Sequence, residues 1–141
     1  MSSSNGNDWA KIMGRDAYAI LTGLEVLRAD PGLAEVRLAV TPQVVNGHGS
    51  LHGGALFTLA DYAAAIAANL NGGPSVAANA TISYLKPVRE GWVTAKAITV
   101  RNGRRMKVQR VDVFDSQGEL CAIFQCGAMT VSLPNSGGGP A

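Results

Sequence analysis

The alternation of hydrophobic and polar residues predicts strands towards both ends of the chain and one long helix between them. A first extended segment begins near Leu24 and stops at the turn signal Asp30-Pro31-Gly32. Residues 35–40 then alternate along the chain, which is typical of a half-buried strand. We therefore predict that these two segments form a hairpin.

The long apolar segment that follows is the clearest helix prediction. It runs from about Gly54 to Asn71, is rich in alanine and leucine, and is followed by the stop signal Gly72-Gly73. The segment is apolar nearly all round, which is typical of a buried helix. A glycine-rich loop, residues 46–54, leads into it.

Four further extended segments are predicted after the helix, at residues 76–85, 92–101, 106–114 and 120–133. Hairpin-type turn signals stand between the second and third segments and between the third and fourth, so these strands should be antiparallel neighbours. The pattern favours an α+β fold in which a curved antiparallel six-stranded sheet wraps around one long buried helix. Such a sheet covers one side of the helix, and a second subunit could cover the other.

The flanking residues set the expected limits of a single domain at 9–133. A short helix is predicted from Trp9, with Asp8 as its N-cap, ending at residue 14 or 19. Residues 1–8 lack the apolar stretch of a signal peptide, and residues 134–141 are rich in Pro, Gly and Ser. Both ends are predicted to be disordered.

Composition narrows the class of protein. Apolar residues make up 47% of the 141 residues and charged residues 16%, which suits a compact protein that buries some apolar surface against other subunits. The net charge is only +2, without one dense basic run, so nucleic-acid binding is not favoured. The longest apolar stretch, residues 55–70, is too short and too polar for a membrane span.

The two cysteines, Cys121 and Cys126, lie in one predicted strand. Their separation of five residues places their side chains on opposite faces, so they cannot readily pair. We expect reduced, buried thiols in a cytoplasmic protein, and neither their spacing nor their neighbours suggest a metal site.

Gly53 and Gly54 place bare backbone at the start of the predicted helix. The first N–H groups of a helix have no partner within it, and the helix dipole favours negative charge there. Adjacent glycines let another molecule approach those groups closely, as an oxyanion site requires. The alternative is that the glycines only form a tight turn between loop and helix.

Asp61 favours the catalytic interpretation, because it lies mid-helix among Leu59, Ala60 and Ala63. A carboxylate is costly to bury there, and burial should raise its pKa towards the range of a useful base or nucleophile. The alternative is a structural aspartate held by a hydrogen bond, for example to Thr58 or to the opening loop.

Helix geometry adds a constraint on how Asp61 and the glycines can act together. Gly54 and Asp61 are seven residues apart, which corresponds to about 10.5 Å along a helix axis. Both groups would have to come within about 3 Å of one carbonyl. Two such helices packed antiparallel about a twofold axis can achieve this, so the site is predicted to be shared between subunits.

The run from Asn46 to Asp61, NGHGSLHGGALFTLAD, resembles the hotdog-fold thioesterases of the PaaI type, which belong to phenylacetate degradation. The similarity extends over nearly the whole globular chain and includes Val40-Thr41-Pro42 and Tyr84-Leu85-Lys86-Pro87. It implies a hotdog fold, a homo-oligomer with a dimer as its minimal unit and usually a tetramer, and hydrolysis of an acyl-CoA thioester. Coenzyme A would be part of the substrate, and no other cofactor is expected.

The same resemblance implies roles for individual residues. Asp61 would act as general base or nucleophile on the thioester carbonyl, and Gly53, with Gly54 as a second donor, would bind the carbonyl oxygen. Asn46 would position the thioester or the attacking water, and His52 would orient the loop or the thioester sulfur.

The chain departs from the family at the strand after the helix. The family often carries a serine or threonine there to hold the attacking water, whereas this chain reads Val76-Ala77-Ala78-Asn79. Asn79, or Thr81 in another register, is expected to take that role.

Basic residues near two turns are candidates for binding the phosphates of coenzyme A. Arg104 and Arg105 follow the turn Asn102-Gly103 and could form charge-assisted hydrogen bonds. Lys86 and Arg89 are weaker candidates, and ordinary solvated charge is the alternative for all four.

Other site classes fit the sequence less well. His48 and His52 have the spacing of a helical metal pair, but they lie in a glycine-rich loop without a following carboxylate, so no metal is predicted. A hotdog hydratase and a non-catalytic acyl-CoA-binding module remain alternatives to the thioesterase. The acyl group itself, whether aromatic, short or medium, stays open.

Overall fold

The structure of the protein is a computed structural model that describes residues 16–131. The expectations for residues 1–8 and 134–141, the limits of the domain and the first part of the helix predicted from Trp9 lie outside the described residues. No helix within the described range is long and apolar enough to cross a membrane.

A short helix, α2 (Ala17–Thr22), opens the described part of the chain. The Asp16 side chain caps it by accepting a hydrogen bond from the Ala19 N–H at 3.0 Å. The helix ends at Gly23, whose φ of 88° lies in the left-handed region. Because α2 begins at Ala17 with a cap of its own, it overlaps the helix predicted from Trp9 only at residues 17–19, in the longer of the two predicted forms.

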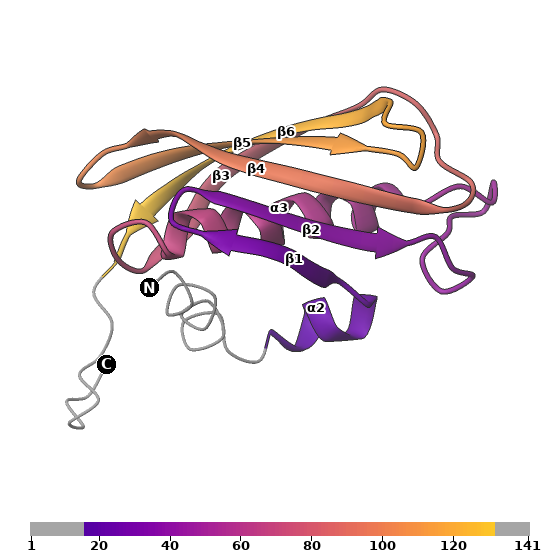
Figure 1. The fold of residues 1–141 in the computed structure, drawn as a ribbon, viewed down its shortest axis with the longest axis horizontal. Coiled ribbons are helices and arrows are strands. Elements are labelled where there is room, and N and C mark those ends of the chain that lie inside the picture. The colour runs from indigo at the N-terminus through magenta and orange to yellow at the C-terminus, as the bar shows by residue number, and fades with distance from the viewer. Residues whose placement is uncertain (1–15, 132–141) are drawn as a thin grey trace.

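Six antiparallel strands form one open sheet in the order β1-β2-β4-β5-β6-β3 (Figure 1). Their bounds are β1 Glu25–Asp30, β2 Leu33–Ala39, β3 Ser75–Tyr84, β4 Trp92–Asn102, β5 Met106–Phe114 and β6 Leu120–Thr130. The predicted α+β class, the six strands and the hairpins are confirmed. Strand β3, which follows the helix, pairs with β6 and leaves its other edge open.

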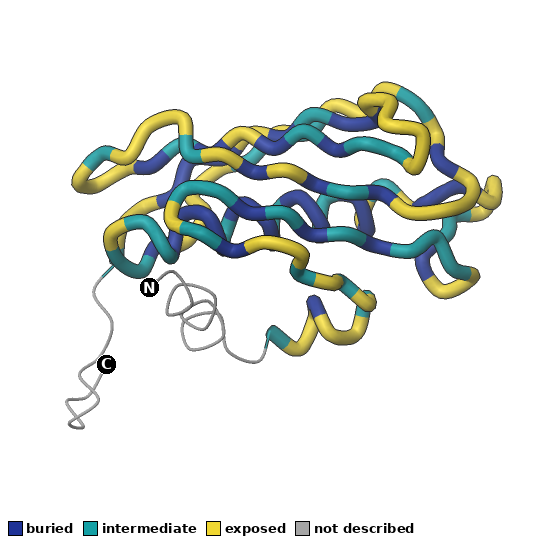
Figure 2. Tube along the Cα trace, in the orientation of Figure 1, coloured by how far each residue is buried: buried dark blue, intermediate teal, exposed yellow. Residues whose placement is uncertain are grey.

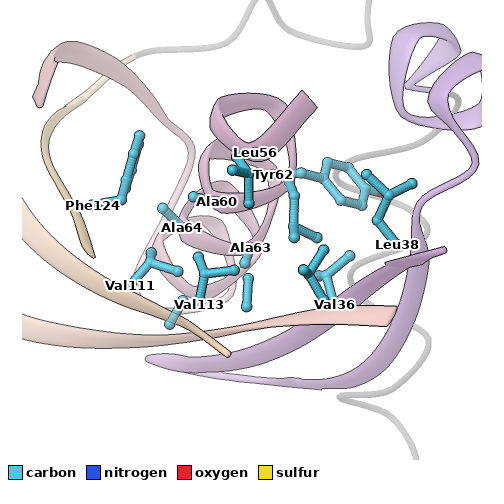
Figure 3. Packing of buried hydrophobic residues seen from close by; sticks show 14 of the residues in the cluster. Val36, Leu38, Leu56, Ala60, Tyr62, Ala63, Ala64, Val111, Val113 and Phe124 are labelled. Atoms are coloured by element: carbon cyan, nitrogen blue, oxygen red, sulfur yellow. The ribbon is translucent and has the colours of Figure 1, made fainter. Parts of the chain in front are cut away.

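The long helix α3 (Gly53–Asn69) lies against the curved face of the sheet (Figure 1). Its apolar side chains and those of the strands form a single core, in which Ala60, Ala63 and Ala64 let the helix approach the valines of β5 (Figure 3). Phe124 of β6 meets Phe57 edge-on, with 5.2 Å between ring centroids. The prediction of one buried helix is therefore confirmed.

The C-terminal end of α3 is held by a buried lysine. Lys107 of β5 is 2% exposed, and its Nζ donates to the carbonyl oxygens of Ala68 and Gly73, both at 3.0 Å. A cation is favourable at this end of a helix because the last carbonyl groups lack partners. Lys107 therefore fixes the helix terminus to the sheet.

Both cysteines are buried, free thiols. The expectation that the two cysteines lie on opposite faces of the sheet is wrong. Both Cys121 and Cys126 belong to the same buried core cluster. The β5–β6 register shifts at Val113/Phe114, opposite Cys121, so strict alternation does not hold across this part of the strand. Burial raises the pKa of each thiol to about 11, which leaves them protonated at neutral pH.

The sheet leaves one long edge exposed. Most residues of β3 are exposed, whereas buried residues alternate with exposed or half-buried ones along β4 and β5 (Figure 2). Val76 and Tyr84 on this strand are more than half exposed. An unpaired edge of this length is a template for pairing with another strand.

Candidate active site

The loop before α3 is organised by Asn46. Its side-chain oxygen Oδ1 accepts hydrogen bonds from the N–H groups of His48 and Ser50, at 2.9 and 3.1 Å, and from the Ser50 hydroxyl at 3.3 Å. These bonds use the acceptor end of the amide. The Nδ2 end has no acceptor among the described residues, so Asn46 shapes the loop and keeps a donor available.

His52 is the N-cap of α3. Its backbone is extended, and its Nδ1 accepts the Gly54 N–H at 2.8 Å. Because Nδ1 is the acceptor, the neutral ring carries its proton on Nε2. The expected part of His52 in orienting the loop agrees with this contact.

The expectation that Gly54 supplies a second oxyanion donor requires a correction. Its N–H is already bonded to His52, so it cannot also point at a substrate oxygen. The N–H groups of Ala55 and Leu56 are likewise occupied by the His52 carbonyl, at 2.9 and 3.1 Å.

Gly53 is different, because its N–H has no acceptor among the described residues. It lines an open groove of about 360 Å³ together with Asn46 and Tyr84. His52 and Gly54 line a separate groove, on which α2 also borders. The structure thus brings Asn46 and Gly53 to one surface and leaves a single free helix N–H there.

Tyr84 belongs to a motif that the chain shares with the family, but the sequence assigned it no role in the site. Its hydroxyl donates to the Gly53 carbonyl oxygen at 2.9 Å, although the two residues are 31 positions apart. Tyr84 lies at the end of β3, and only the folding of that strand beside the helix start creates the contact. No local signal in the sequence could have indicated it.

Asp61 lies in the middle of α3 and is half-buried. It lines a narrow cavity between the helix and the sheet, together with Ala77, Gln109 and Cys126. Burial raises the pKa of Asp61, and the negative charge of Asp16 raises it further. The alternative of a hydrogen bond from Thr58 does not hold, because the Thr58 hydroxyl donates to the Gly54 carbonyl at 2.8 Å.

The water-holding role expected of Asn79 is not supported by its position. Asn79 is exposed, does not line the Asp61 cavity, and accepts the Gly127 N–H at 3.3 Å. A bulge between Ala77 and Asn79 reverses the direction of the side chains, so Ala77 faces the cavity and Asn79 does not. Thr81 is also exposed and outside the cavity.

One chain does not bring Asp61 and Gly53 together. They are eight residues apart on the same helix, which corresponds to about 12 Å along its axis. Two groups that act on one carbonyl must both lie within about 3 Å of it.

The basic residues of the candidate site lie at two different ends of the molecule. Arg104 and Arg105 are exposed in the β4–β5 turn, beside the C-terminal end of α3, where Asn102 contacts Asn71 at 3.4 Å. This end is remote from Gly53 of the same chain.

Near Gly53 the cations are already engaged. Lys86 pairs with Asp115 at 2.7 Å and also with Glu119, and these hydrogen bonds raise the pKa of Lys86. Arg89 donates to the His48 carbonyl at 2.6 Å, so it supports the loop.

Comparison with known proteins places the chain in a family. The thioesterase superfamily matches residues 48–122. The acyl-coenzyme A thioesterase PaaI of Escherichia coli (strain K12) is 39% identical over 111 residues, which cover 78% of this chain and 79% of that protein. The chain therefore belongs to the thioesterase superfamily of thioester-hydrolysing enzymes.

Solved structures agree with this placement. The structure of the Escherichia coli PaaI protein from the phenylacetic acid degradation operon matches with a TM-score of 0.84 and 32% identity, over 93% of this chain and 94% of that chain. A mutant of the phenylacetic acid degradation protein PaaI from Thermus thermophilus matches with a TM-score of 0.79 and 36% identity, over 82% of this chain and all of that chain. The six-stranded sheet with its long helix is thus the hotdog fold.

Proposed function

We propose that this protein hydrolyses acyl-CoA thioesters, with Asp61 as general base or nucleophile and the Gly53 N–H as donor to the oxyanion. The observation that carries the proposal is the single free N–H at the start of α3. Gly54, Ala55 and Leu56 use theirs within the protein, while Gly53 presents its own to an open groove. A donor fixed in this way stabilises charge that develops on a carbonyl oxygen.

The chemistry follows from a carboxylate with a raised pKa. As a base, Asp61 takes a proton from water, and the resulting hydroxide attacks the thioester carbonyl. The Gly53 N–H donates a hydrogen bond to the oxyanion of the tetrahedral intermediate. Collapse of this intermediate expels the thiolate and gives the free acid. The thiolate then takes the proton from Asp61 to give coenzyme A. As a nucleophile, Asp61 would attack the thioester carbonyl, expel the coenzyme A thiolate and form an anhydride, which water then hydrolyses to the free acid and Asp61. Coenzyme A enters as part of the substrate, and no resident cofactor is proposed.

A shared site follows from the separation of about 12 Å between Gly53 and Asp61 on one helix. Antiparallel pairing of two β3 edges about a twofold axis would also bring two α3 helices side by side and antiparallel. Asp61 of one subunit would then approach Gly53 of the other. The exposed edge of β3 and the half-buried face of α3 at Asp61 and Ala65 support this arrangement. We expect two such dimers to pair into a tetramer.

In the same arrangement, the partner subunit would bind the phosphates of the coenzyme A whose thioester lies at Gly53. Arg104 and Arg105 lie at the C-terminal end of α3, which an antiparallel partner would place near Gly53 of the first subunit. Their guanidinium groups have no hydrogen-bond partner within residues 16–131, so they remain available to phosphate.

The test is thiol release from a panel of aromatic, short and medium acyl-CoA esters, with wild type beside Asp61→Asn. Hydrolysis by wild type and a loss of about 10² or more in the variant would support the proposal, because a base or nucleophile contributes at least this much. Binding of the esters without thiol release by wild type would contradict it and favour the binding module. The best substrate would define the acyl group.

A further inference from the structure

The peptide unit between Gly53 and Gly54, at the start of α3, is hydrogen-bonded at both its carbonyl and its N–H group. Its carbonyl group, that of Gly53, accepts a hydrogen bond from the Tyr84 hydroxyl at 2.9 Å. Its N–H group, that of Gly54, donates to His52 Nδ1 at 2.8 Å. The free N–H of Gly53 lies directly before this unit in the chain, so the orientation of the clamped peptide restricts the direction in which that N–H points.

A side chain at either glycine would crowd these contacts. A Cβ atom on Gly53 would lie 3.1 Å from the Tyr84 ring and from its hydroxyl oxygen, and a Cβ atom on Gly54 would lie 3.0 Å from His52 Nδ1. Neither glycine has a positive φ, so conformational freedom is not the reason for them. Bare backbone at both positions lets the two side chains reach the peptide between them.

We infer that Tyr84 is a positioning residue for the oxyanion donor, acting with His52 to fix the peptide that follows the Gly53 N–H. The inference rests on the proposed function. Donors that are already aligned need no reorganisation when charge develops in the transition state. A misplacement of about 1 Å can cost about 10² in rate, so the orientation of this peptide should matter for turnover.

Tyr84 is not assigned as a second oxyanion donor. A phenol has one proton to donate, and that proton is used in the bond to the Gly53 carbonyl. Its ring lines the groove beside Gly53 and Asn46, so a substrate contact is the competing explanation. The two explanations differ in what they change: a positioning role acts on the transition state, and a contact role acts equally on bound substrate.

The deciding variant is Tyr84→Phe, which keeps the ring and removes the hydroxyl. We expect kcat to fall about tenfold or more with KM unchanged within about twofold, because the lost alignment is used only in the transition state. The matched control is Tyr18→Phe on α2, which is 58% exposed and should keep the wild-type kcat. An unchanged kcat in Tyr84→Phe, or a rise in KM alone, would overturn the inference.

A second pair of variants tests the other end of the same peptide. His52→Ala removes the acceptor of the Gly54 N–H and should lower kcat, whereas His52→Asn retains a good N-cap acceptor and should lose less. If both side chains act on one peptide, the double variant Tyr84→Phe/His52→Ala should lose clearly less than the product of the single losses. Independent, multiplicative losses would contradict the shared role.

These outcomes are separable from failure of the proposed function. Wild type without thiol release, or Asp61→Asn with full activity, would remove the proposed function itself. If wild type is active, Asp61→Asn is inactive and Tyr84→Phe has the wild-type kcat, only the positioning role of Tyr84 is excluded. If Tyr84→Phe does not fold by circular dichroism, the contrast between His52→Ala and His52→Asn decides: equal kcat values would overturn the inference.

Discussion

The carboxylate of Asp16, which caps α2, acts electrostatically on Asp61 in the middle of α3 and raises its pKa. Burial of Asp61 is the larger cause, and both influences favour its protonated form. We therefore expect the cap of α2 to influence the ionisation of the candidate site, a role that the sequence pattern did not predict for Asp16.

Activity should fall on the acid side as the pH drops through the raised pKa of Asp61, because a base or nucleophile must be ionised. Asp16→Asn removes the like charge and keeps a side-chain oxygen for the Ala19 N–H. The acid limb of the kcat/KM profile of Asp16→Asn should therefore move to lower pH. Burial still keeps the pKa of Asp61 above its ordinary value. Asp112→Asn, on the outer side of β5, is the control with the same change in net charge. Equal shifts in both variants would contradict a local effect of Asp16.

Asp61 should also reduce the stability of the folded protein at neutral pH. Its folded-state pKa is raised above the ordinary value of 3.8, so the folded protein holds the proton more tightly than the unfolded chain. The stabilisation from protonated Asp61 is present at low pH and is lost as the pH rises through the raised pKa. Asp61→Asn should therefore have a higher Tm than wild type at about pH 8, with a gain that shrinks towards about pH 4. A Tm difference that is constant over this range would show that ionisation of Asp61 is not the cause.

A hydroxyl at position 77 should improve catalysis. Ala77 lines the cavity beside Asp61, where a serine could hold the attacking water. We expect Ala77→Ser to raise kcat by about threefold or more through better positioning of that water. Ala78→Ser is the matched control, because Ala78 is the extra residue of the bulge and is outside the cavity. A gain in both variants, or in neither, would contradict this assignment.

The sequence predicted the elements well because they depend on local signals. The hairpin around Pro31-Gly32, the six strands and the long helix follow from turn residues and periodicity, and Asp61 stood out as a carboxylate in an apolar helix. The position of Asn79 could not be predicted, because residues 77 and 79 share a face in a regular strand and only the bulge separates them. The contact of Tyr84 with Gly53 and the electrostatic influence of Asp16 on Asp61 depend on tertiary packing, for which periodicity gives no signal. At the start of α3, the Gly54 N–H donates to the His52 side chain and the next two N–H groups donate to the His52 carbonyl, so the Gly53 N–H is the one that stays free.

Lys107 should contribute substantially to stability and little to chemistry. Its ammonium group is buried and donates to the Ala68 carbonyl in the last turn of α3 and to the Gly73 carbonyl in the loop that follows. Lys107→Met leaves the Gly73 carbonyl without a donor among the described residues and leaves the Ala68 carbonyl with the Asn71 N–H alone. We therefore expect a loss of about 1–3 kcal/mol in the free energy of unfolding. Arg105→Met, in the exposed turn nearby, should leave the free energy of unfolding within about 0.5 kcal/mol of wild type. Chemical denaturation of both variants would test this, and equal stabilities would refute the capping role.

Mixing two inactive variants should restore activity if Asp61 and Gly53 of different subunits form each site. Asp61→Asn removes the carboxylate, and Gly53→Ala places a methyl group 3.1 Å from the Tyr84 side chain, so we expect the Tyr84 contact and the Gly53 donor to shift. In a mixed dimer one site would carry both defects and the other neither. After exchange of equal amounts, half of the dimers are mixed and half of their sites are intact, so about a quarter of wild-type activity should return.

The opposite geometry makes a different prediction for the same experiment. If Asp61 and Gly53 of one chain formed a site, every site in a mixed dimer would carry one defect, and mixing would restore nothing. Two affinity tags of different mass, one on each variant, allow the mixed dimers to be isolated and their fraction measured. Purified mixed dimers with no more activity than the two parents would therefore exclude a shared site. Their recovery to about half the wild-type rate per dimer would support it, because one site in two is intact.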